Sequence, residues 1–186
     1  MAEPAKQKAT YDDLYAIPEN TTGEIIDGEL FVTPRPARRH VHAASTLGGE
    51  IVPPFHFGRG GGPGGWIIYH EPELQLGEHT LVPDLAGWRK ERFSAQPDEV
   101  GITVPPDWVC EILSPSTVRM DKVRKMPIYA QYGVRHLWLV EPLARTLDVF
   151  KLESQRWSLL ATFTENDKVR IEPFQEIEME LGNLWV

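Results

Sequence analysis

The sequence predicts an α/β or α+β fold, in which a mixed β-sheet is flanked by two or three helices. Short apolar runs of strand length, separated by turn residues, recur between residues 24 and 171. Two longer segments, 37–51 and 117–132, have the composition or spacing of helices instead. The length of 186 residues suits one domain, and neither a repeat nor a linker divides it. We therefore expect a single domain over residues 1–186, with residues 1–9 flexible.

Composition excludes several classes of protein. Hydrophobic residues make up 41% and charged residues 25%, which is typical of a globular chain and not of a disordered one or a coiled coil. The single cysteine, Cys110, cannot form an intrachain disulfide or a multi-cysteine zinc site, and it favours a reducing compartment. No apolar run approaches the roughly 20 residues of a membrane-spanning helix. We expect a cytoplasmic protein.

Charge is distributed unevenly along the chain. The net charge of −8 works against a broad phosphate-binding surface, because affinity for duplex DNA comes largely from Lys and Arg. Two basic clusters nevertheless stand out, one of Arg35, Arg38 and Arg39 and one of Arg119, Lys122, Arg124 and Lys125. This segregation permits a small site for a polyanion. The alternative, that each cluster is only a solvated helix face, stays open.

Caps, turn pairs and prolines predict the elements of the N-terminal third. These are a short helix capped by Thr10 and ended by Pro18, a hairpin over 24–33 around Asp27-Gly28, and a helix over 37–51 stopped by Pro53 and Pro54.

The remainder alternates between strands and one helix. The segments 66–76 and 80–88 are predicted as two strands joined by a turn at 77–79, followed by a loop over 89–106 and a central strand over 108–113. A helix over 117–132 should end at Gly133 and be kinked or divided at Pro127. Further strands are expected at 136–140, 147–152, 157–163 and 169–171.

Two carboxylates stand in strand-like segments that are otherwise apolar. Asp84 follows Pro83, and Glu111 lies between Cys110 and Ile112. A carboxylate in such a position is costly unless it is paired or bound to a cation. Two of them on neighbouring strands could share a divalent ion such as Mg²⁺, which prefers oxygen ligands. For each residue the alternative of a loop cap or a structural ion pair remains.

Side-chain alternation and helical spacing add detail to this pair. Glu111 should share one face of its strand with Leu113, while Cys110 points to the opposite face as a core residue. Position 113, where a lysine would lie beside Glu111, is leucine, so another cation must supply that charge. Lys122, Lys125 and Tyr129 have the spacing of one face of the following helix.

The ordered set of motifs resembles the PD-(D/E)XK restriction-endonuclease-like superfamily and, within it, the bacterial Uma-two family. No single motif is specific, but their order is, and the likeness runs from residue 11 to residue 149 and more loosely beyond. The segments that carry it are Glu-Ile-Ile-Asp-Gly-Glu at 24–29, Val-Pro-Asp-Leu at 82–85, Cys-Glu-Ile-Leu-Ser-Pro-Ser-Thr at 110–117, the residues Asp121, Lys125, Tyr129, Gly133 and Val134, and Leu-Trp-Leu-Val-Glu-Pro at 137–142.

The resemblance implies a restriction-endonuclease-like mixed sheet and a metal-dependent endonuclease that hydrolyses phosphodiester bonds in DNA. Asp84 and Glu111 match the family's ligands for Mg²⁺ or Mn²⁺, and Lys125, with Lys122 in reserve, stands in for the lysine that the motif expects at 113. The resemblance leaves a third ligand open, with Glu73 ahead of Glu50 and Glu29. Tyr129 and His42 are supporting candidates. Arg35, Arg38, Arg39 and the glycine-rich segment 58–65 are expected to contact the substrate backbone, and a homodimer is expected by analogy.

Other interpretations remain beside this one. His40 and His42 have a spacing that could ligate zinc from a strand, but on a helix these positions diverge, which favours surface roles. The displaced lysine and the acidic balance favour an alternative function, a non-catalytic module that binds nucleic acid or protein and keeps the nuclease fold. A subunit that recruits a basic partner through its acidic C-terminal part is a further alternative.

Overall fold

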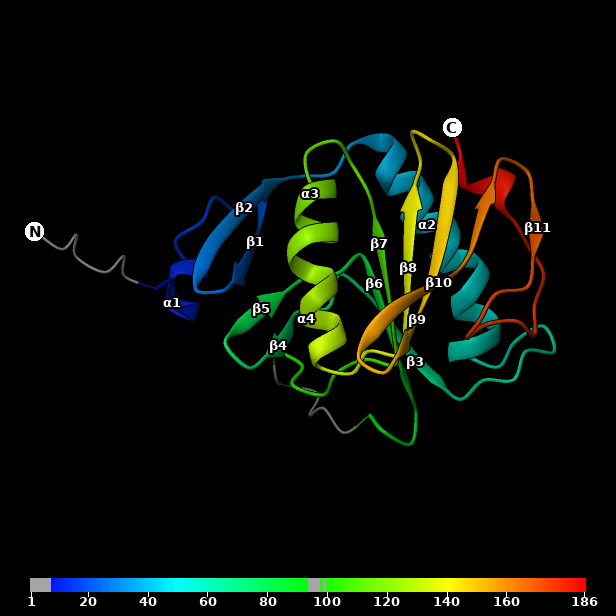
Figure 1. Ribbon diagram of the computed structural model, residues 1–186, viewed down its shortest axis with the longest axis horizontal. Coiled ribbons are helices and arrows are strands. Elements are labelled where there is room, and N and C mark those ends of the chain that lie inside the picture. Colours follow the sequence, from blue (N-terminus) through cyan, green and yellow to red (C-terminus); the bar gives the residue numbers. More distant parts are fainter. Residues whose placement is uncertain (1–7, 94–97, 99) are drawn as a thin grey trace, which may run out of the picture.

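A six-stranded mixed sheet forms the centre of the computed structural model, which describes residues 8–93, 98 and 100–186 (Figure 1). Its central neighbours β7 and β8 run parallel, and the other neighbouring strands run antiparallel. In spatial order the strands are β10 (Arg156–Thr164), β9 (Thr146–Glu153), β8 (His136–Glu141), β7 (Trp108–Ile112), β6 (Leu85–Arg89) and β3 (Trp66–His70).

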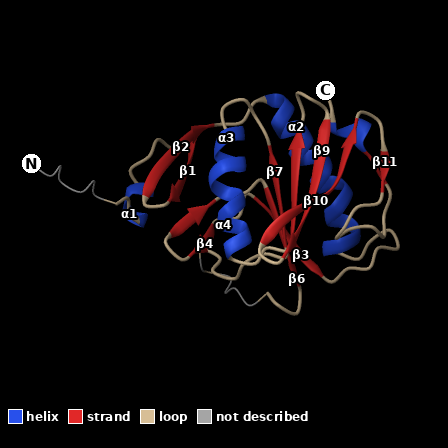
Figure 2. Ribbon diagram, in the orientation of Figure 1, coloured by secondary structure: helices blue, strands red, loops and turns tan. Residues whose placement is uncertain are grey.

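A smaller antiparallel sheet lies beside the large one (Figure 2). It contains the expected hairpin, in which Asp27 and Gly28 both have positive φ angles, 53° and 75°. Its strands, in order, are β2 (Glu29–Pro34), β1 (Thr21–Ile26), β5 (His79–Leu81) and β4 (Leu74–Leu76). A separate two-stranded sheet consists of β11 (Lys168–Val169) and β12 (Met179–Glu180).

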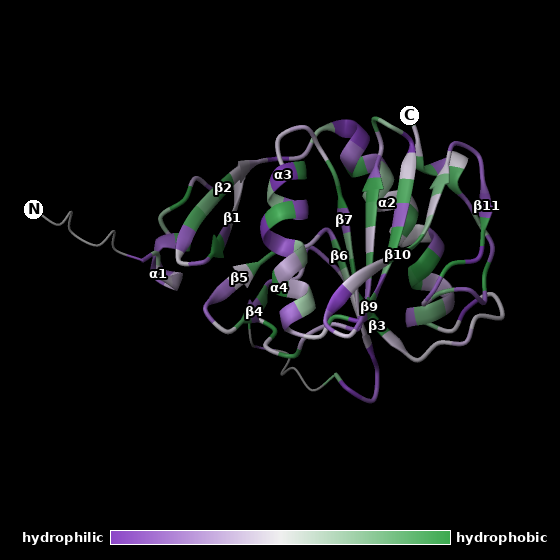
Figure 3. Cartoon of the chain, in the orientation of Figure 1, coloured by the Kyte–Doolittle hydropathy of each residue, from purple (hydrophilic) through white to green (hydrophobic). Residues whose placement is uncertain are grey.

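Helices cover both faces of the large sheet, and each face has its own hydrophobic core. The helix α2 (Arg38–Ile51) and the 3₁₀-helix η3 (Leu181–Leu184) pack with Trp108, Cys110 and Ile112 on one face. The opposite face of β7 buries Val109 against α4 (Met126–Gln131) and the small sheet. This alternation confirms Cys110 as a core residue, and hydrophobic residues are frequent along the central strands (Figure 3). Within the described ranges, no helix combines the length and apolar character needed to cross a membrane.

Two expected strands are each interrupted, which corrects the prediction of continuous strands over 66–76 and 80–88. The first divides into β3 and β4 and the second into β5 and β6, so that one half of each belongs to each sheet. Glu71, at the first break, has φ 46°, and its amide donates to the Asp84 carbonyl at the second break. Pro83 lacks the N–H that a ladder requires, which accounts for the second interruption. Asp84 therefore lies between strands and not within one.

Both helical segments change geometry near prolines, against the prediction at Pro53 and Pro54 and in agreement with it at Pro127. Pro53 and Pro54 do not stop the second helix, which continues as a π-helical turn, η1 (Val52–His56). The change from α to π geometry falls where the two prolines lack the N–H that an α-helix interior requires. The expected helix over 117–132 is made of α3 (Val118–Met120), the π-helical turn η2 (Asp121–Lys125) and α4, with Pro127 in the first turn of α4.

The N-terminal segment contains a short helix and is joined to the hairpin by a hydrogen bond. The short N-terminal helix α1 (Tyr11–Leu14) has Thr10 and Asp13 in a capping box, as the sequence predicts for Thr10. Residues 1–7 of the segment expected to be flexible lie outside the described residues, as do 94–97 and 99 of the expected loop. Ala9 is tied to the hairpin by a hydrogen bond from its amide to the Gly28 carbonyl.

Candidate active site

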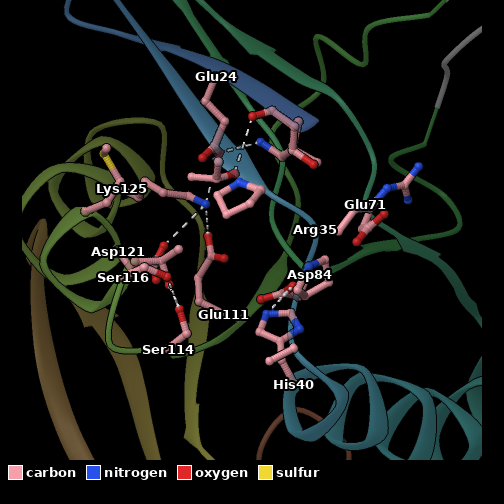
Figure 4. Close-up of a pocket in the computed structure, with 18 of the residues that line it drawn as sticks. Glu24, Arg35, His40, Glu71, Asp84, Glu111, Ser114, Ser116, Asp121 and Lys125 are labelled. Atoms are coloured by element: carbon pink, nitrogen blue, oxygen red, sulfur yellow. Dashed lines mark hydrogen bonds and ion pairs between the residues drawn. The ribbon is translucent and has the colours of Figure 1, made fainter. Parts of the chain in front are cut away.

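Asp84 and Glu111 meet at one end of the paired strands β6 and β7. Asp84 Oδ2 accepts a hydrogen bond of 2.6 Å from the amide of Ile112, the residue after Glu111. The contact arises because Asp84 immediately precedes β6, whose first residue, Leu85, pairs with Cys110 of β7. Both carboxylates line a cavity of about 400 Å³ (Figure 4). The two acids that the sequence places on separate strands are thus brought to one site.

Lys125 reaches the same cavity from the helix that follows β7. Its Nζ lies 2.9 Å from Glu111 Oε1, 3.0 Å from Glu24 Oε1 and 3.5 Å from Asp121 Oδ1. Within the π-helical turn η2 only Asp121 and Lys125 are buried, while Lys122 is exposed. Of the two lysine candidates, the structure therefore brings Lys125 to the carboxylates and turns Lys122 away.

Tyr129 supports Glu111 from the next turn of the helix. Its hydroxyl donates a hydrogen bond of 2.6 Å to Glu111 Oε1, and both side chains are buried. Lys125 contacts the same oxygen, so Tyr129 and Lys125 both hold Glu111 through Oε1. The spacing of Lys125 and Tyr129 on one helix face, read from the sequence, matches these contacts.

Glu24 is a buried member of the site that sequence reasoning did not select. It comes from β1 in the small sheet, and its Oε1 accepts a hydrogen bond of 2.8 Å from the amide of Val82. It precedes the apolar pair Ile25 and Ile26, so it carries the same signal as Glu111, a carboxylate in an apolar strand. Asp121 and Glu71 also line the cavity and were likewise not selected.

His40 forms the wall beside Asp84. Its Nε2 lies 3.0 Å from Asp84 Oδ1, and it lines the cavity from the first turn of α2. His42, two positions later, instead contacts the Asn183 carbonyl at 3.0 Å. The two histidines diverge as expected for a helix, but His40 belongs to the site and not to the open surface.

Burial and ion pairing shift the pKa values of Lys125, Glu111 and Asp121. Burial alone lowers the pKa of Lys125, but Glu111 and Glu24 outweigh it and hold that pKa well above its usual value. Burial raises the pKa of Glu111 well above its usual value, while Lys125 acts in the opposite direction. Burial likewise raises the pKa of Asp121, against the effect of Lys125. One ammonium thus serves three carboxylates, a balance that favours the uptake of a further cation or a proton.

The donor set fits a magnesium ion better than a metal held only by protein. Among the described residues, no three His, Cys, Asp or Glu side chains are grouped so as to enclose a metal by themselves. Mg²⁺ commonly uses one or two carboxylates and completes its shell with water and substrate phosphate. Asp84 and Glu111, with the surplus negative charge around them, suit that mode.

Several other sequence candidates lie outside this cavity. Glu73 accepts hydrogen bonds from Tyr11 and Gln75, and Glu29 pairs with Arg124 at 3.7 Å. The lining of the cavity, as the described residues form it, includes neither of these acids and neither Glu50 nor the glycine-rich segment 58–65. Of the three expected backbone-binding arginines, Arg35 lines the cavity, while Arg38 and Arg39 are exposed in the first turn of α2.

Comparison with known proteins identifies the family. Residues 9–182 match the model of the Uma2 family, described as "Putative restriction endonuclease". The chain belongs to the Uma2 family. Among curated proteins none matches the chain.

A solved structure matches the Uma2 fold over nearly the whole chain. It is the crystal structure of "a putative nuclease belonging to DUF820" from Anabaena variabilis, with a TM-score of 0.74 and 22% sequence identity, and the match covers 93% of this chain and 95% of that one. The likeness confirms the restriction-endonuclease-like mixed α/β fold. The family membership confirms the resemblance read from the ordered motifs.

Proposed function

We propose that this Uma2 protein is a metal-dependent endonuclease that hydrolyses phosphodiester bonds in DNA. The observation that carries the proposal is the convergence of Asp84, Glu111 and Lys125 on one cavity. Two carboxylates can hold a divalent ion that assists phosphodiester hydrolysis, and an ammonium can stabilise the charge that develops on the phosphate. The family description agrees with this chemistry.

Asp84 and Glu111 are the residues that would hold the ion, Mg²⁺ or Mn²⁺. When bound, such an ion lowers the pKa of water and offsets negative charge on a phosphate. Asp84 is oriented for this role by the Ile112 amide and His40, and Glu111 by Tyr129 and Lys125. Each carboxylate therefore enters the reaction with its position already fixed.

Lys125 contributes charge and not basicity. Because Glu111 and Glu24 raise its pKa, it keeps its proton and cannot accept one from water at neutral pH. Its ammonium can orient the attacking water by hydrogen bonding and stabilise charge that develops on the phosphate. Arg35, exposed at the same cavity, is suited to contact a neighbouring phosphate.

Cleavage of labelled DNA by wild-type protein and by Asp84→Ala and Glu111→Gln tests the proposal. We expect cleavage that requires Mg²⁺ or Mn²⁺, stops with a chelator, and falls by at least 100-fold in both variants. Glu50→Gln is the matched control, because this glutamate lies outside the cavity lining. Equal cleavage by wild type and Asp84→Ala would mean that the activity comes from another site or from a contaminant.

A binding module that keeps the nuclease fold is the second candidate. It is favoured by one observation, that Lys125 is held by three carboxylates while position 113 is leucine. Calorimetric titration with Mg²⁺ or Mn²⁺ separates the two candidates. The endonuclease requires a divalent-ion site that is lost in both Asp84→Ala and Glu111→Gln, whereas the module requires none.

A further inference from the structure

We infer that DNA enters this site as an unpaired strand, so that the substrate class is single-stranded DNA or an unpaired stretch within a duplex. The inference rests on the proposed function and narrows it. Three features carry it: the depth of the reacting groups, the walls around them, and the position of the exposed arginines.

The groups proposed to act on the phosphate line the cavity with little of their surface exposed to solvent. The side chains of Glu111 and Lys125 are each 3% exposed, and those of Asp84 and His40 are each 15% exposed. A phosphate that reaches Asp84 and Glu111 must therefore leave the outer surface of the protein and enter the cavity. The flanking nucleotides must follow its path or turn away from it.

Walls from several elements restrict how the flanking nucleotides can be placed. Thr22 and Glu24 of β1, the end of β2 and the turn that begins at Ser114 all line the cavity, and Figure 4 shows Glu24 and Ser114 at opposite ends of the labelled side chains. The cavity volume of about 400 Å³ is in the range of small-molecule pockets. A site of this size takes one or two nucleotides of a strand and not a stretch of double helix.

Duplex DNA is poorly suited to such a recess. It is stiff over about 150 base pairs, and its phosphates lie on the outside of stacked, paired bases. To carry a phosphate into the cavity, a duplex would have to unstack and unpair the nucleotides beside it, and that cost is least where the bases are already unpaired. An unpaired strand can bend its backbone into the cavity without this cost.

The charge distribution leads to the same substrate. Five carboxylates, those of Glu24, Glu71, Asp84, Glu111 and Asp121, line the cavity and would repel a long run of phosphates. Exposed Arg35 lies at this cavity, and exposed Arg38 and Arg39 follow closely in the chain. Duplex binding instead uses Lys and Arg spread along both strands. One group of arginines beside an acidic cavity suits a short segment of one strand.

Initial cleavage rates on three forms of one labelled oligonucleotide test the inference. The strand is used alone, annealed to its full complement, and annealed to a complement that leaves a central unpaired bubble. With Mg²⁺ or Mn²⁺ we expect the free strand to be cleaved at least 10-fold faster than the full duplex. Cleavage of the bubble substrate should fall within the unpaired nucleotides.

Controls connect the rates to this site and distinguish the two hypotheses. Asp84→Ala should abolish cleavage of all three forms, and a strand without self-complementarity prevents transient pairing. If the full duplex is cleaved as fast as the free strand, the inference is overturned while the proposed function stands. If folded wild-type protein cleaves none of the three forms, the proposed function fails and the inference fails with it.

Discussion

The Oε1 atom of Glu24 lies 3.0 Å from the Lys125 ammonium and 2.8 Å from the Val82 amide nitrogen. One buried oxygen thus joins the helix that carries Lys125 to the segment that leads into Asp84. Because Glu24 belongs to the small sheet, this contact also fixes the small sheet against the site. Glu24 therefore positions two of the groups proposed to act on substrate.

Replacing Glu24 with glutamine should reduce the rate of cleavage more than the affinity for substrate. The amide of Glu24→Gln can still accept the Val82 hydrogen bond, but it no longer neutralises Lys125. Loss of a group that orients the ligands of a metal site typically costs about 10- to 100-fold in activity, and we take the same range for a group that positions Lys125. We expect a fall of that size in kcat with KM nearly unchanged.

Glu19→Gln provides the control for this variant, since Glu19 is exposed just before the same hairpin. It should cleave at the wild-type rate. A Glu24→Gln protein with wild-type kcat would show that the charge of Glu24 has no part in positioning Lys125.

The sequence predicts the site better than it predicts the loops and turns that build it. Asp84, Glu111 and Lys125 follow from carboxylates in apolar segments and from an ordered set of motifs, and all three line one cavity. Glu24 is 58 residues from its partner Val82, so no local pattern reveals their contact.

The interrupted strands were missed for a related reason. Apolar periodicity continues through residues 66–76 and 80–88, but each segment contributes a strand to both sheets. The first segment divides at the positive φ angle of Glu71, and the second divides at Pro83. Residues three apart, such as Lys122 and Lys125, lie near the same face of a helix, so their spacing alone does not tell which of the two lysines is buried. Packing of the π-helical turn settles it.

Removing the Lys125 charge should destabilise the protein strongly. Lys125→Met keeps an unbranched side chain in the space but leaves Glu24, Glu111 and Asp121 without their cation. Breaking a buried ion pair in this way costs about 3–5 kcal/mol. We expect a loss of that size in the free energy of unfolding at pH 8, measured by urea denaturation.

The loss should shrink as the pH is lowered. The folded-state pKa of Glu111 is already raised, and removal of the ammonium raises it further, so the carboxyl takes up a proton in the folded protein before it does so in the unfolded chain. Lys122→Met, one turn away and exposed, should change stability by no more than about 0.5 kcal/mol. Equal losses in the two variants would contradict the central place of Lys125.

Glu172 should contribute to stability at neutral pH and lose that contribution in acid. Its carboxylate lies 2.8 Å from Lys151 Nζ and 3.2 Å from His136 Nε2, and the hydrogen bonds from these two groups lower its pKa. A carboxylate with a lowered folded-state pKa stabilises the fold above its unfolded pKa and ceases to do so as the pH falls through the folded value.

Thermal unfolding of Glu172→Gln therefore separates this contact from a packing role. Relative to wild type, the variant should have a lower Tm at pH 7, and the difference should close toward pH 3. Because Glu172 and Lys151 are partly exposed, the difference at pH 7 should also shrink in high salt. A Tm difference that is constant with pH would assign the effect to shape and not to charge.

Gly133 ends the helix that carries Lys125 and Tyr129, and its substitution tests the backbone alone. Its φ angle is 76°, and a Cβ built there would meet no atom within 4 Å. Gly133→Ala should therefore cost about 1 kcal/mol in the free energy of unfolding, because the left-handed conformation is strained for alanine, and Gly133→Asn should cost less.

Gly49→Ala makes the same substitution within α2, also with no atom within 4 Å but without a positive φ angle. That variant should be more stable than wild type by about 0.5–1 kcal/mol, since alanine favours a helix where glycine does not. A loss in both variants would show that the added methyl group, and not the backbone conformation of Gly133, causes the destabilisation.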